Sequence, residues 1–251
     1  MLLAQDISLL RGGAVVLDNV SAQFEQGQIT AICGPNGAGK SSLLMTLAGL
    51  LEPTKGSVTL DGQPLDTLHP RVRAQKVGYL PQDAEVAWDV AVENIVRLGR
   101  MPHRDRGDDA VEAAIAALDL EHLRYRPALQ LSGGEKARAL LARVLAGEPK
   151  WILADEPLAA LDLAHQQTLL RHFRAAADAG AGILIVVHDL ATAMNHADRV
   201  IVLQEGLLAA DGAPEEALSP ANIAKVWGVT AHWIGEEGAR ALVNEKEALN
   251  E

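Results

Sequence analysis

Residues 34–41 of the chain, Gly-Pro-Asn-Gly-Ala-Gly-Lys-Ser, match the phosphate-binding pattern G-x-x-x-x-G-K-[ST] at every fixed position. The segment before this loop is mostly apolar, as a buried strand requires, and apolar residues recur at helical spacing over 41–50. Backbone N–H groups of such a loop and the positive end of the helix dipole surround phosphate oxygens. Lys40 would bind the β and γ phosphates, and the Ser41 hydroxyl would be a ligand of Mg²⁺. The sequence therefore predicts a site for a nucleoside triphosphate, built from Asn36, Gly37, Ala38, Gly39, Lys40, Ser41 and Ser42.

The second half of the chain predicts a largely parallel sheet. Apolar, strand-like segments alternate there with segments of helical spacing. That order implies right-handed crossovers between parallel strands, with ligands bound at the carboxyl ends of the strands. Lys40 and Asp155 would both lie at that edge. The predicted strands of this half are 151–154, 183–187 and 199–203, and its predicted helices are 163–179 and 190–196. One more buried strand, 28–33, is predicted before the phosphate loop.

The other regions differ in pattern, and we expect all of them to belong to one domain spanning residues 1–251. Short apolar segments divided by turn residues predict antiparallel strands near the N-terminus. The middle of the chain has helical spacing, as in 108–120 with Val111, Ala114, Ile115 and Leu118. The expected limits are an antiparallel part at about 1–31 and 56–80, a helical part at about 86–145, and a tail, 235–251, that is a solvated helix or a frayed end.

Two adjacent carboxylates, Asp155 and Glu156, follow the apolar strand 151–154. Neighbouring residues of a strand point to opposite faces, but the chain turns at the end of the strand, so both side chains can approach the phosphates. Asp155 is expected to hold Mg²⁺, and Glu156 is expected to orient and polarise the water that attacks the γ-phosphate. Two acids after a strand can also simply mark a loop, and the nearby phosphate loop is what favours the catalytic interpretation.

Residues 131–135, Leu-Ser-Gly-Gly-Glu, are a second candidate for binding an anion. Ser132 is a favourable helix N-cap, and Glu135 completes a capping box with it, which is a structural role that needs no ligand. Glycines at the first two helical positions are unfavourable for a helix, however, and they leave backbone N–H groups open to a phosphate. One nucleotide needs only one main cradle. Ser132, Gly133 and Gly134 are therefore predicted to serve a nucleotide held by another copy, in a homodimer.

Composition limits the partners of the chain. The formal net charge is −11, from 22 basic and 33 acidic residues, and a nucleic-acid or anionic-lipid surface would need a basic face. The only cysteine, Cys33, cannot form an internal disulfide and is expected to be a small buried side chain, as in a reducing cytoplasm. Apolar runs such as 183–187 are far shorter than the ~20 residues that span a bilayer. We expect no nucleic-acid partner, and we expect any membrane contact to be made through a protein partner.

The chain resembles ATP-binding cassette (ABC) ATPase subunits over nearly its whole length, to about Trp233, through six motifs in the same order and approximate spacing. The resemblance implies a P-loop NTPase core with a mainly parallel sheet, an N-terminal antiparallel β subdomain and an inserted α-helical subdomain. It also implies hydrolysis of ATP with Mg²⁺ in a head-to-tail dimer that sandwiches two ATP molecules. Each ATP would lie between Lys40 of one copy and residues 132–134 of the other. The motifs are 34–41, Gln82, 131–135, Asp155 with Glu156, 160–162 and His188.

The resemblance also implies roles that the residues alone do not indicate. Gln82 would contact Mg²⁺ and report on a permease, and His188 would contact the γ-phosphate, joining Lys40 and Glu156 in catalysis. Asp162 would lie at the dimer seam, a role compatible with that of N-cap for the following helix. Arg11 stands where the family usually has a tyrosine that stacks on adenine. Because the planar guanidinium can also cover a ring, we expect Arg11 to contact the base and discrimination between ATP and GTP to be loose.

A narrower resemblance concerns residues 98–103, Leu-Gly-Arg-Met-Pro-His, and 161–166, Leu-Asp-Leu-Ala-His-Gln. These segments look like those of ATPases in bacterial importers for iron-siderophores, haem and cobalamin, although they could simply pack helices. The resemblance implies a subunit at the cytoplasmic face of the inner membrane, bound to an integral membrane permease dimer that a periplasmic binding protein supplies. The three substrates remain open, because the ATPase never touches the cargo.

Two other functions are compatible with parts of the sequence. A soluble ABC ATPase that is not coupled to transport, such as one for iron–sulfur cluster assembly, has a similar length. ABC proteins of DNA repair and translation fit less well, because they carry long coiled coils or two cassettes. A nucleotide-gated scaffold without useful hydrolysis is disfavoured by the presence of Glu156 and His188.

Overall fold

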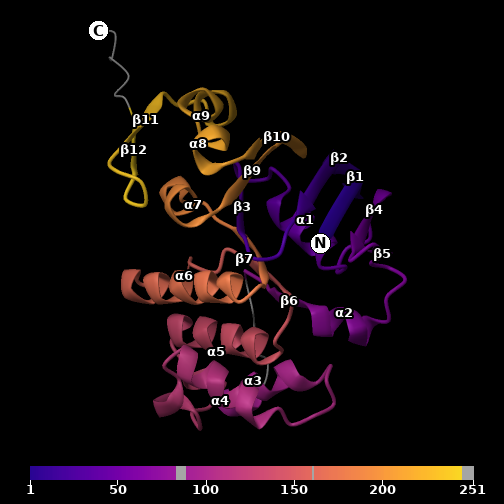
Figure 1. The fold of residues 1–251 in the computed structure, drawn as a ribbon, viewed down its shortest axis with the longest axis vertical. Coiled ribbons are helices and arrows are strands. Elements are labelled where there is room, and N and C mark those ends of the chain that lie inside the picture. The colour runs from indigo at the N-terminus through magenta and orange to yellow at the C-terminus, as the bar shows by residue number, and fades with distance from the viewer. Residues whose placement is uncertain (83–88, 160, 245–251) are drawn as a thin grey trace.

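A computed structural model describes residues 1–82, 89–159 and 161–244 of the protein. An antiparallel sheet at the N-terminus lies beside a central, mainly parallel sheet, and a group of helices is inserted below the central sheet (Figure 1). This is the predicted α/β architecture with its antiparallel and helical parts. The predicted start of the helical part at 86–88, residue 160 of the Ala-Leu-Asp motif and residues 245–251 of the tail lie outside the described residues.

The central sheet has the strand order β10-β9-β3-β8-β7-β6, and every pair is parallel except β9 with β10. Every residue of β3, β7 and β8 is buried. Parallel strands that are covered on both faces need such continuous apolar sequences, which is why the sequence predicts them well. The strands are β3 (Ile29–Cys33), β6 (Val77–Leu80), β7 (Trp151–Asp155), β8 (Gly182–Val186), β9 (Arg199–Gln204) and β10 (Leu207–Gly212).

Alternate residues of the central strands enter two separate cores, as the two-residue period of a strand requires. In β7, Ile152 and Ala154 pack with the helices of one face, whereas Trp151 and Leu153 pack with α1 and the antiparallel sheet on the other face. The covering helices are α1 (Lys40–Leu47), α6 (Leu163–Asp178) and α7 (Leu190–His196). The two cores fix the sheet on both sides, so the loops at its carboxyl edge start from rigid strand ends.

The antiparallel sheet has the strand order β2-β1-β4-β5. The expected limits of 1–31 and 56–80 reach too far, because β3 and β6, at the ends of those ranges, pair within the central sheet. A short apolar segment indicates a strand without indicating which sheet takes it. The elements of this part are β1 (Leu2–Arg11), β2 (Ala14–Phe24), β4 (Lys55–Leu60), β5 (Gln63–Pro64) and helix α2 (Pro70–Lys76).

The helical part packs on the central sheet through α5, which contacts β6. The apolar spacing predicted for 108–120 is confirmed, since Val111, Ala114, Ile115 and Leu118 are all buried. The α-helices are α3 (Val92–Arg97), α4 (Asp108–Ala117) and α5 (Gly133–Ala146), and short 3₁₀ turns cover Leu98–Arg100, Glu121–Leu123 and Ala128–Gln130.

The C-terminal segment is more ordered than the sequence predicts. Residues 241–244, expected in a solvated helix or frayed end, form a strand that pairs antiparallel with β11, so that expectation is wrong for them. Arg240 and Asn195 exchange backbone-to-side-chain hydrogen bonds of 2.8 Å in both directions, which joins the hairpin to α7. The elements are α8 (Pro214–Ala217), α9 (Pro220–Trp227), β11 (Ala231–Ile234) and β12 (Ala241–Asn244).

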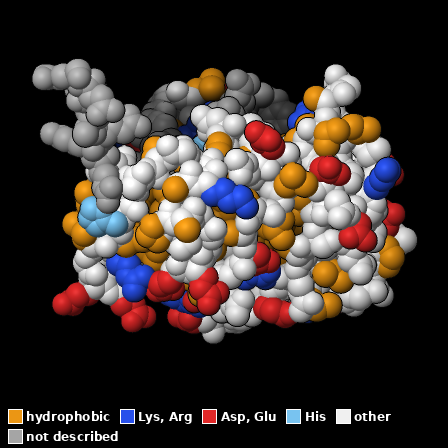
Figure 2. Space-filling model, turned by 90° about the horizontal axis from the view of Figure 1, so that it is seen from above, with side chains coloured by type: hydrophobic (Ala, Val, Ile, Leu, Met, Phe, Trp, Pro, Cys, Tyr) orange, Lys and Arg blue, Asp and Glu red, His pale blue; other side chains and the backbone are white. Residues whose placement is uncertain are grey.

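The surface agrees with the acidic composition. On the face shown in Figure 2, Lys and Arg side chains lie singly or beside acidic ones, and they form no continuous basic patch there. Among residues 1–82, 89–159 and 161–244, none of the helices is both long enough and apolar enough to cross a membrane.

Candidate nucleotide-binding and catalytic site

The phosphate loop connects β3 to α1, as predicted, and its shape depends on glycine. Gly34 has φ +147° and Gly39 has φ +98°. A Cβ atom on Gly34 would lie 2.2 Å from the carbonyl oxygen of Leu203, and one on Gly39 would lie 2.6 Å from that of Val16. No side chain fits either position. The loop is therefore pressed against β9 on one side and β2 on the other.

Lys40 begins α1 and is only 6% exposed. Its Nζ donates hydrogen bonds to the carbonyl oxygens of Gly34 (2.9 Å) and Pro35 (3.0 Å), so the side chain folds back along the loop. Burial lowers the pKa of Lys40, and the negative charge of Glu156 opposes that shift. The ammonium group thus lies where a second anion, such as a phosphate, would favour its charged form.

Ser41 and Asp155 meet across the edge of the sheet. The Ser41 hydroxyl donates to Asp155 Oδ1 at 3.0 Å. Asp155 is 4% exposed, and burial raises the pKa of its carboxyl, with the Ser41 hydrogen bond acting in the opposite direction. A hydroxyl and a carboxylate oxygen are hard ligands of the type Mg²⁺ prefers, with water and phosphate completing its coordination. The two predicted ligands therefore fit the ion.

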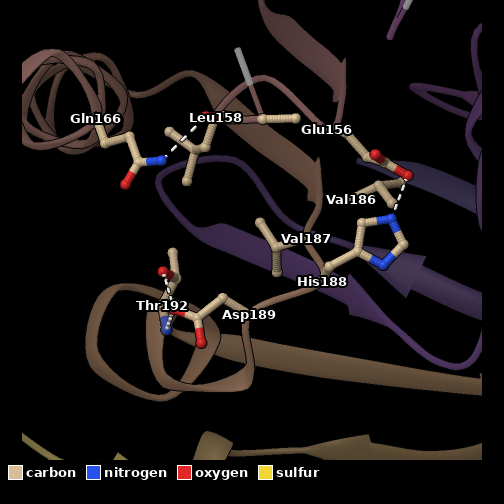
Figure 3. A pocket seen from close by; sticks show the side chains of 9 residues that line it. Glu156, Leu158, Gln166, Val186, Val187, His188, Asp189 and Thr192 are labelled. Carbon is tan, nitrogen blue, oxygen red and sulfur yellow. Dashed lines mark hydrogen bonds and ion pairs between the residues drawn. The ribbon is translucent and has the colours of Figure 1, made fainter. Parts of the chain in front are cut away.

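Glu156 follows β7 in the left-handed region, with φ +49°, and its backbone N–H donates to the Val186 carbonyl. The carboxylate of Glu156 meets two partners. Gln82 Nε2 donates to Glu156 Oε2 at 2.6 Å, and His188 Nε2 lies 2.5 Å from Oε1 (Figure 3). The structure thus joins three of the predicted site residues. Gln82, expected at Mg²⁺, has its amide nitrogen on Glu156.

The 131–135 segment forms the predicted capping box at the start of α5. Ser132 Oγ accepts from the N–H of Glu135 at 3.3 Å, and Glu135 accepts from the N–H of Ser132 at 2.8 Å. That N–H lowers the pKa of the Glu135 carboxyl. Ser132 and Gly133 are exposed, and the first N–H groups of any helix have no partner within it. The tip of α5 therefore presents donors to solvent, which suits an anion.

A cleft of about 310 Å³ separates the tip of α5 from the sheet edge. Gly133 and Lys136 line one side, and Gln82 and Glu156 line the other. Among the described residues that line this cleft, none comes from the phosphate loop 34–41.

Asp162 caps α6, as predicted. Its Oδ1 accepts from the backbone N–H of His165 at 2.9 Å, and the ring Nδ1 of the same histidine lies 2.7 Å away. The backbone N–H lowers the pKa of the Asp162 carboxyl. Its place at a dimer seam stays a prediction.

Arg11 ends β1, where it pairs with Ala14 and is exposed. Because Val16, two residues after Ala14, touches the phosphate loop at Gly39, the β1–β2 turn lies at the side of that loop. Contact of Arg11 with a base stays a prediction.

A second pocket, which the sequence does not predict, lies behind Glu156 and His188. Gln166 from α6 and Asp189 and Thr192 at the start of α7 line it (Figure 3). Asp189 caps α7 through the N–H groups of residues 191 and 192, so a sequence signal existed in an Asp directly before an apolar helical segment. The signal indicates a cap and carries no information about a pocket.

Comparison with known proteins agrees with this geometry. The model of the ABC transporter family matches residues 17–159. The hemin import ATP-binding protein HmuV of Pseudomonas putida is 43% identical over 91% of this chain and 93% of its own length, and HmuV of Myxococcus xanthus is 40% identical over 97% of both. A dimeric ATP-binding cassette in a post-hydrolysis state, bound to ADP and Pi, has a TM-score of 0.78 at 26% identity, over 85% of this chain and 99% of its own. The chain belongs to the ABC transporter family and carries that family's ATPase domain.

Proposed function

We propose that this chain hydrolyses ATP to drive the import of haem through a membrane permease. One observation carries the enzymatic part: Lys40, Ser41, Asp155, Glu156 and His188 come together at a single sheet edge. The cargo follows from relatives named as hemin import ATP-binding proteins at 40–43% identity. Their names favour haem among the three substrate types that the sequence left open.

Binding of ATP uses groups that are already in place. The loop N–H groups and the N-terminus of α1 face the phosphates. Lys40 exchanges its hydrogen bonds with the carbonyls of Gly34 and Pro35 for the β and γ phosphate oxygens. Ser41 and Asp155 would hold Mg²⁺, and the amide oxygen of Gln82 is a third candidate ligand. When bound, the ion offsets negative charge on the phosphates.

Hydrolysis depends on Glu156 and His188. The Glu156 carboxylate would accept a hydrogen bond from the attacking water. That bond would orient the oxygen atom of the water toward the γ-phosphate. His188 is in contact with Glu156, and from there it would reach the γ-phosphate and stabilise the developing charge. Because Gln82 and His188 both hold the glutamate carboxylate, its position is fixed before the substrate arrives.

The working unit is a head-to-tail homodimer under a permease dimer, at the cytoplasmic face of the membrane, with a periplasmic binding protein that delivers haem. Residues 132–134 of one copy complete the ATP site of the other. The exposed tip of α5 supports this arrangement, as does the cleft between that tip and the sheet edge, which the phosphate loop does not line. In the segment 98–103, Met101 is 69% exposed and suits contact with the permease.

The variant Glu156→Gln tests the enzymatic part. It removes the acceptor charge with little change of shape, so we expect ATP turnover to fall by about 100-fold or more while ATP still binds. Steady-state hydrolysis and nucleotide binding on the purified chain measure both quantities. Glu121→Gln, on an exposed glutamate in a 3₁₀ turn, should leave both unchanged. Full turnover by Glu156→Gln would remove Glu156 from the mechanism.

The cargo is tested with the chain purified from membranes together with the permease it binds. In liposomes with the chain and ATP in the lumen and the periplasmic binding protein outside, the complex should accumulate haem and not cobalamin or an iron-siderophore. The names of the relatives favour neither cobalamin nor an iron-siderophore as the cargo. If the chain were instead a soluble ATPase of iron–sulfur cluster assembly, no permease would co-purify with it.

A further inference from the structure

The pocket behind the catalytic pair has a volume of about 170 Å³ and opens at the surface between α6 and α7. Leu158, Val186 and Val187, all less than a tenth exposed, supply aliphatic carbons to its wall. Figure 3 shows Val187 directed into its centre, with Glu156 and His188 along one side. An apolar cavity of ~150 Å³ is large enough for a six-carbon ring such as benzene. A four-carbon leucine side chain therefore fits this pocket.

Each polar side chain that lines the pocket already has at least one hydrogen-bond partner within the chain. Gln166 Nε2 donates to the carbonyl oxygens of Leu158 (3.0 Å) and Leu161 (3.2 Å). Asp189 accepts from the N–H and the hydroxyl of Thr192 at 2.9 and 2.6 Å. A polar guest would have to compete with these bonds, whereas an apolar guest would leave them intact. The chemistry of the pocket thus favours an aliphatic occupant.

A leucine without a local partner lies beside the pocket. Leu163, the first residue of α6, is 72% exposed, and the N1 position of a helix does not require an aliphatic side chain. Gln166, which lines the pocket, is one turn further along the same helix, so the two residues are neighbours on its surface. Asp162, predicted at the dimer seam, directly precedes Leu163.

We infer that Leu163 of each copy inserts into the pocket of the other copy in the ATP-bound homodimer. A two-fold contact requires a surface patch that is complementary to itself, with the protruding group and its receptor close together on one subunit. Leu163 and the pocket meet that requirement, and Leu163 directly follows Asp162, which is predicted to lie at the dimer seam. Since Glu156 and His188 form one side of the pocket, a seated leucine would report dimer closure to the catalytic pair. This inference depends on the homodimer of the proposed function.

Cross-linking tests the contact directly. Cys33 is fully buried, so engineered surface cysteines can be oxidised selectively. In the Glu156→Gln background with Mg·ATP, a long tagged copy bearing Leu163→Cys is mixed with a short copy bearing Ala159→Cys, at the exposed rim of the pocket. We expect a disulfide between the long and short copies that depends on ATP. The matched control replaces Ala159→Cys with Leu207→Cys, on an exposed leucine of β10, and should give none.

Affinity gives a second test. Leu163→Asp should weaken the ATP-driven dimer by roughly tenfold or more, because burial of a leucine is lost, whereas Leu163→Met should retain it. The melting temperature of the free subunit should not fall, since the site is exposed and an acid suits a helix N-terminus. If Glu156→Gln dimerises on gel filtration but neither cross-link nor affinity responds, the inference is wrong and the homodimer stands. If Glu156→Gln does not dimerise with Mg·ATP, both the Leu163 contact and the proposed homodimer are wrong.

Discussion

Gly34 shows how a single residue type is required at the phosphate loop. Its backbone has φ +147°, and a Cβ atom would meet the Leu203 carbonyl at 2.2 Å, so β9 or the loop would have to move. We expect Gly34→Ala to lower the free energy of unfolding by at least ~1–3 kcal/mol, the usual cost of such backbone strain, and to weaken ATP binding. Urea unfolding and nucleotide titration measure the two effects.

The control for this variant is Gly12→Ala in the β1–β2 turn. Gly12 also has a positive φ, +56°, but no other atom would lie within 4 Å of its Cβ, so the cost should be limited to strain. Equal destabilisation by the two variants would contradict the steric explanation for Gly34.

Asp155 should show a conflict between stability and activity. Burial raises the pKa of its carboxyl in the folded state. At pH values between the pKa of the unfolded state and that of the folded state, the folded protein therefore binds more protons than the unfolded protein. The free energy of unfolding of the wild-type protein should consequently fall as pH rises through that range. Asp155→Asn keeps an oxygen for the Ser41 hydroxyl and carries no charge. We therefore expect this variant, without nucleotide, to be more stable than wild type at neutral pH, with a gain that vanishes at acidic pH, and to hydrolyse ATP poorly. Urea unfolding at several pH values measures the gain.

Glu93 provides the opposite case. Hydrogen bonds from Arg124 and then Arg97 lower the pKa of Glu93 to about 2, so its stabilising effect is present above the ordinary glutamate pKa and is lost as pH falls toward 2. Glu93→Gln should therefore destabilise the protein at neutral pH.

If Asp155→Asn were also less stable than wild type at neutral pH, burial of the Asp155 carboxylate would not be destabilising.

At the scale of elements, the start of α5 has a structural role as a capped helix end and a proposed role in nucleotide binding. Ser132→Ala removes the side-chain acceptor of the capping box and should cost ~0.5–2 kcal/mol of stability. Ser219→Ala removes the equivalent cap of α9 and should cost a similar amount. Only Ser132→Ala should also reduce ATP turnover beyond what its loss of stability explains, because only α5 is proposed to contact a nucleotide. Unfolding and turnover of the two variants, compared side by side, separate the roles.

The elements that the sequence predicts correctly are those whose signal is local. The strand ending at Asp155 is a continuous apolar run, and helix α7 occupies the predicted residues 190–196. The C-terminal hairpin was not predictable in the same way, because β12 is a strand only through its pairing with β11 and its attachment to Asn195. A tail rich in Glu and Ala has helical propensity, and tertiary pairing overrides it for residues 241–244.

At the scale of the whole molecule, motifs separated by more than a hundred residues meet at one edge. The parallel-sheet rule predicts that Lys40 and Asp155 both lie at that edge, and the hydrogen bond from Ser41, the residue after Lys40, to Asp155 agrees with it. The same rule does not predict that Gln82 donates to Glu156, because Gln82 lies two residues beyond the end of β6, where strand geometry no longer fixes its position. The pocket behind Glu156 and His188 was not predictable from the sequence either, because its wall combines residues of α6, of α7 and of the strand ends.

The proposed division of the ATP site between two copies predicts that stabilisation by ATP depends on protein concentration. A ligand that binds only the folded state raises stability by about 2.7 kcal/mol at 100 times its dissociation constant. If residues 132–134 of a second copy complete the site, the bound state is a dimer, and the rise in melting temperature of Glu156→Gln with Mg·ATP should grow as protein concentration increases. Ser132→Ala in that background should reduce this dependence, whereas Ser219→Ala should not. A rise independent of protein concentration would mean that each subunit binds ATP alone, because dissociation of a dimer on unfolding is the only source of the dependence in this scheme.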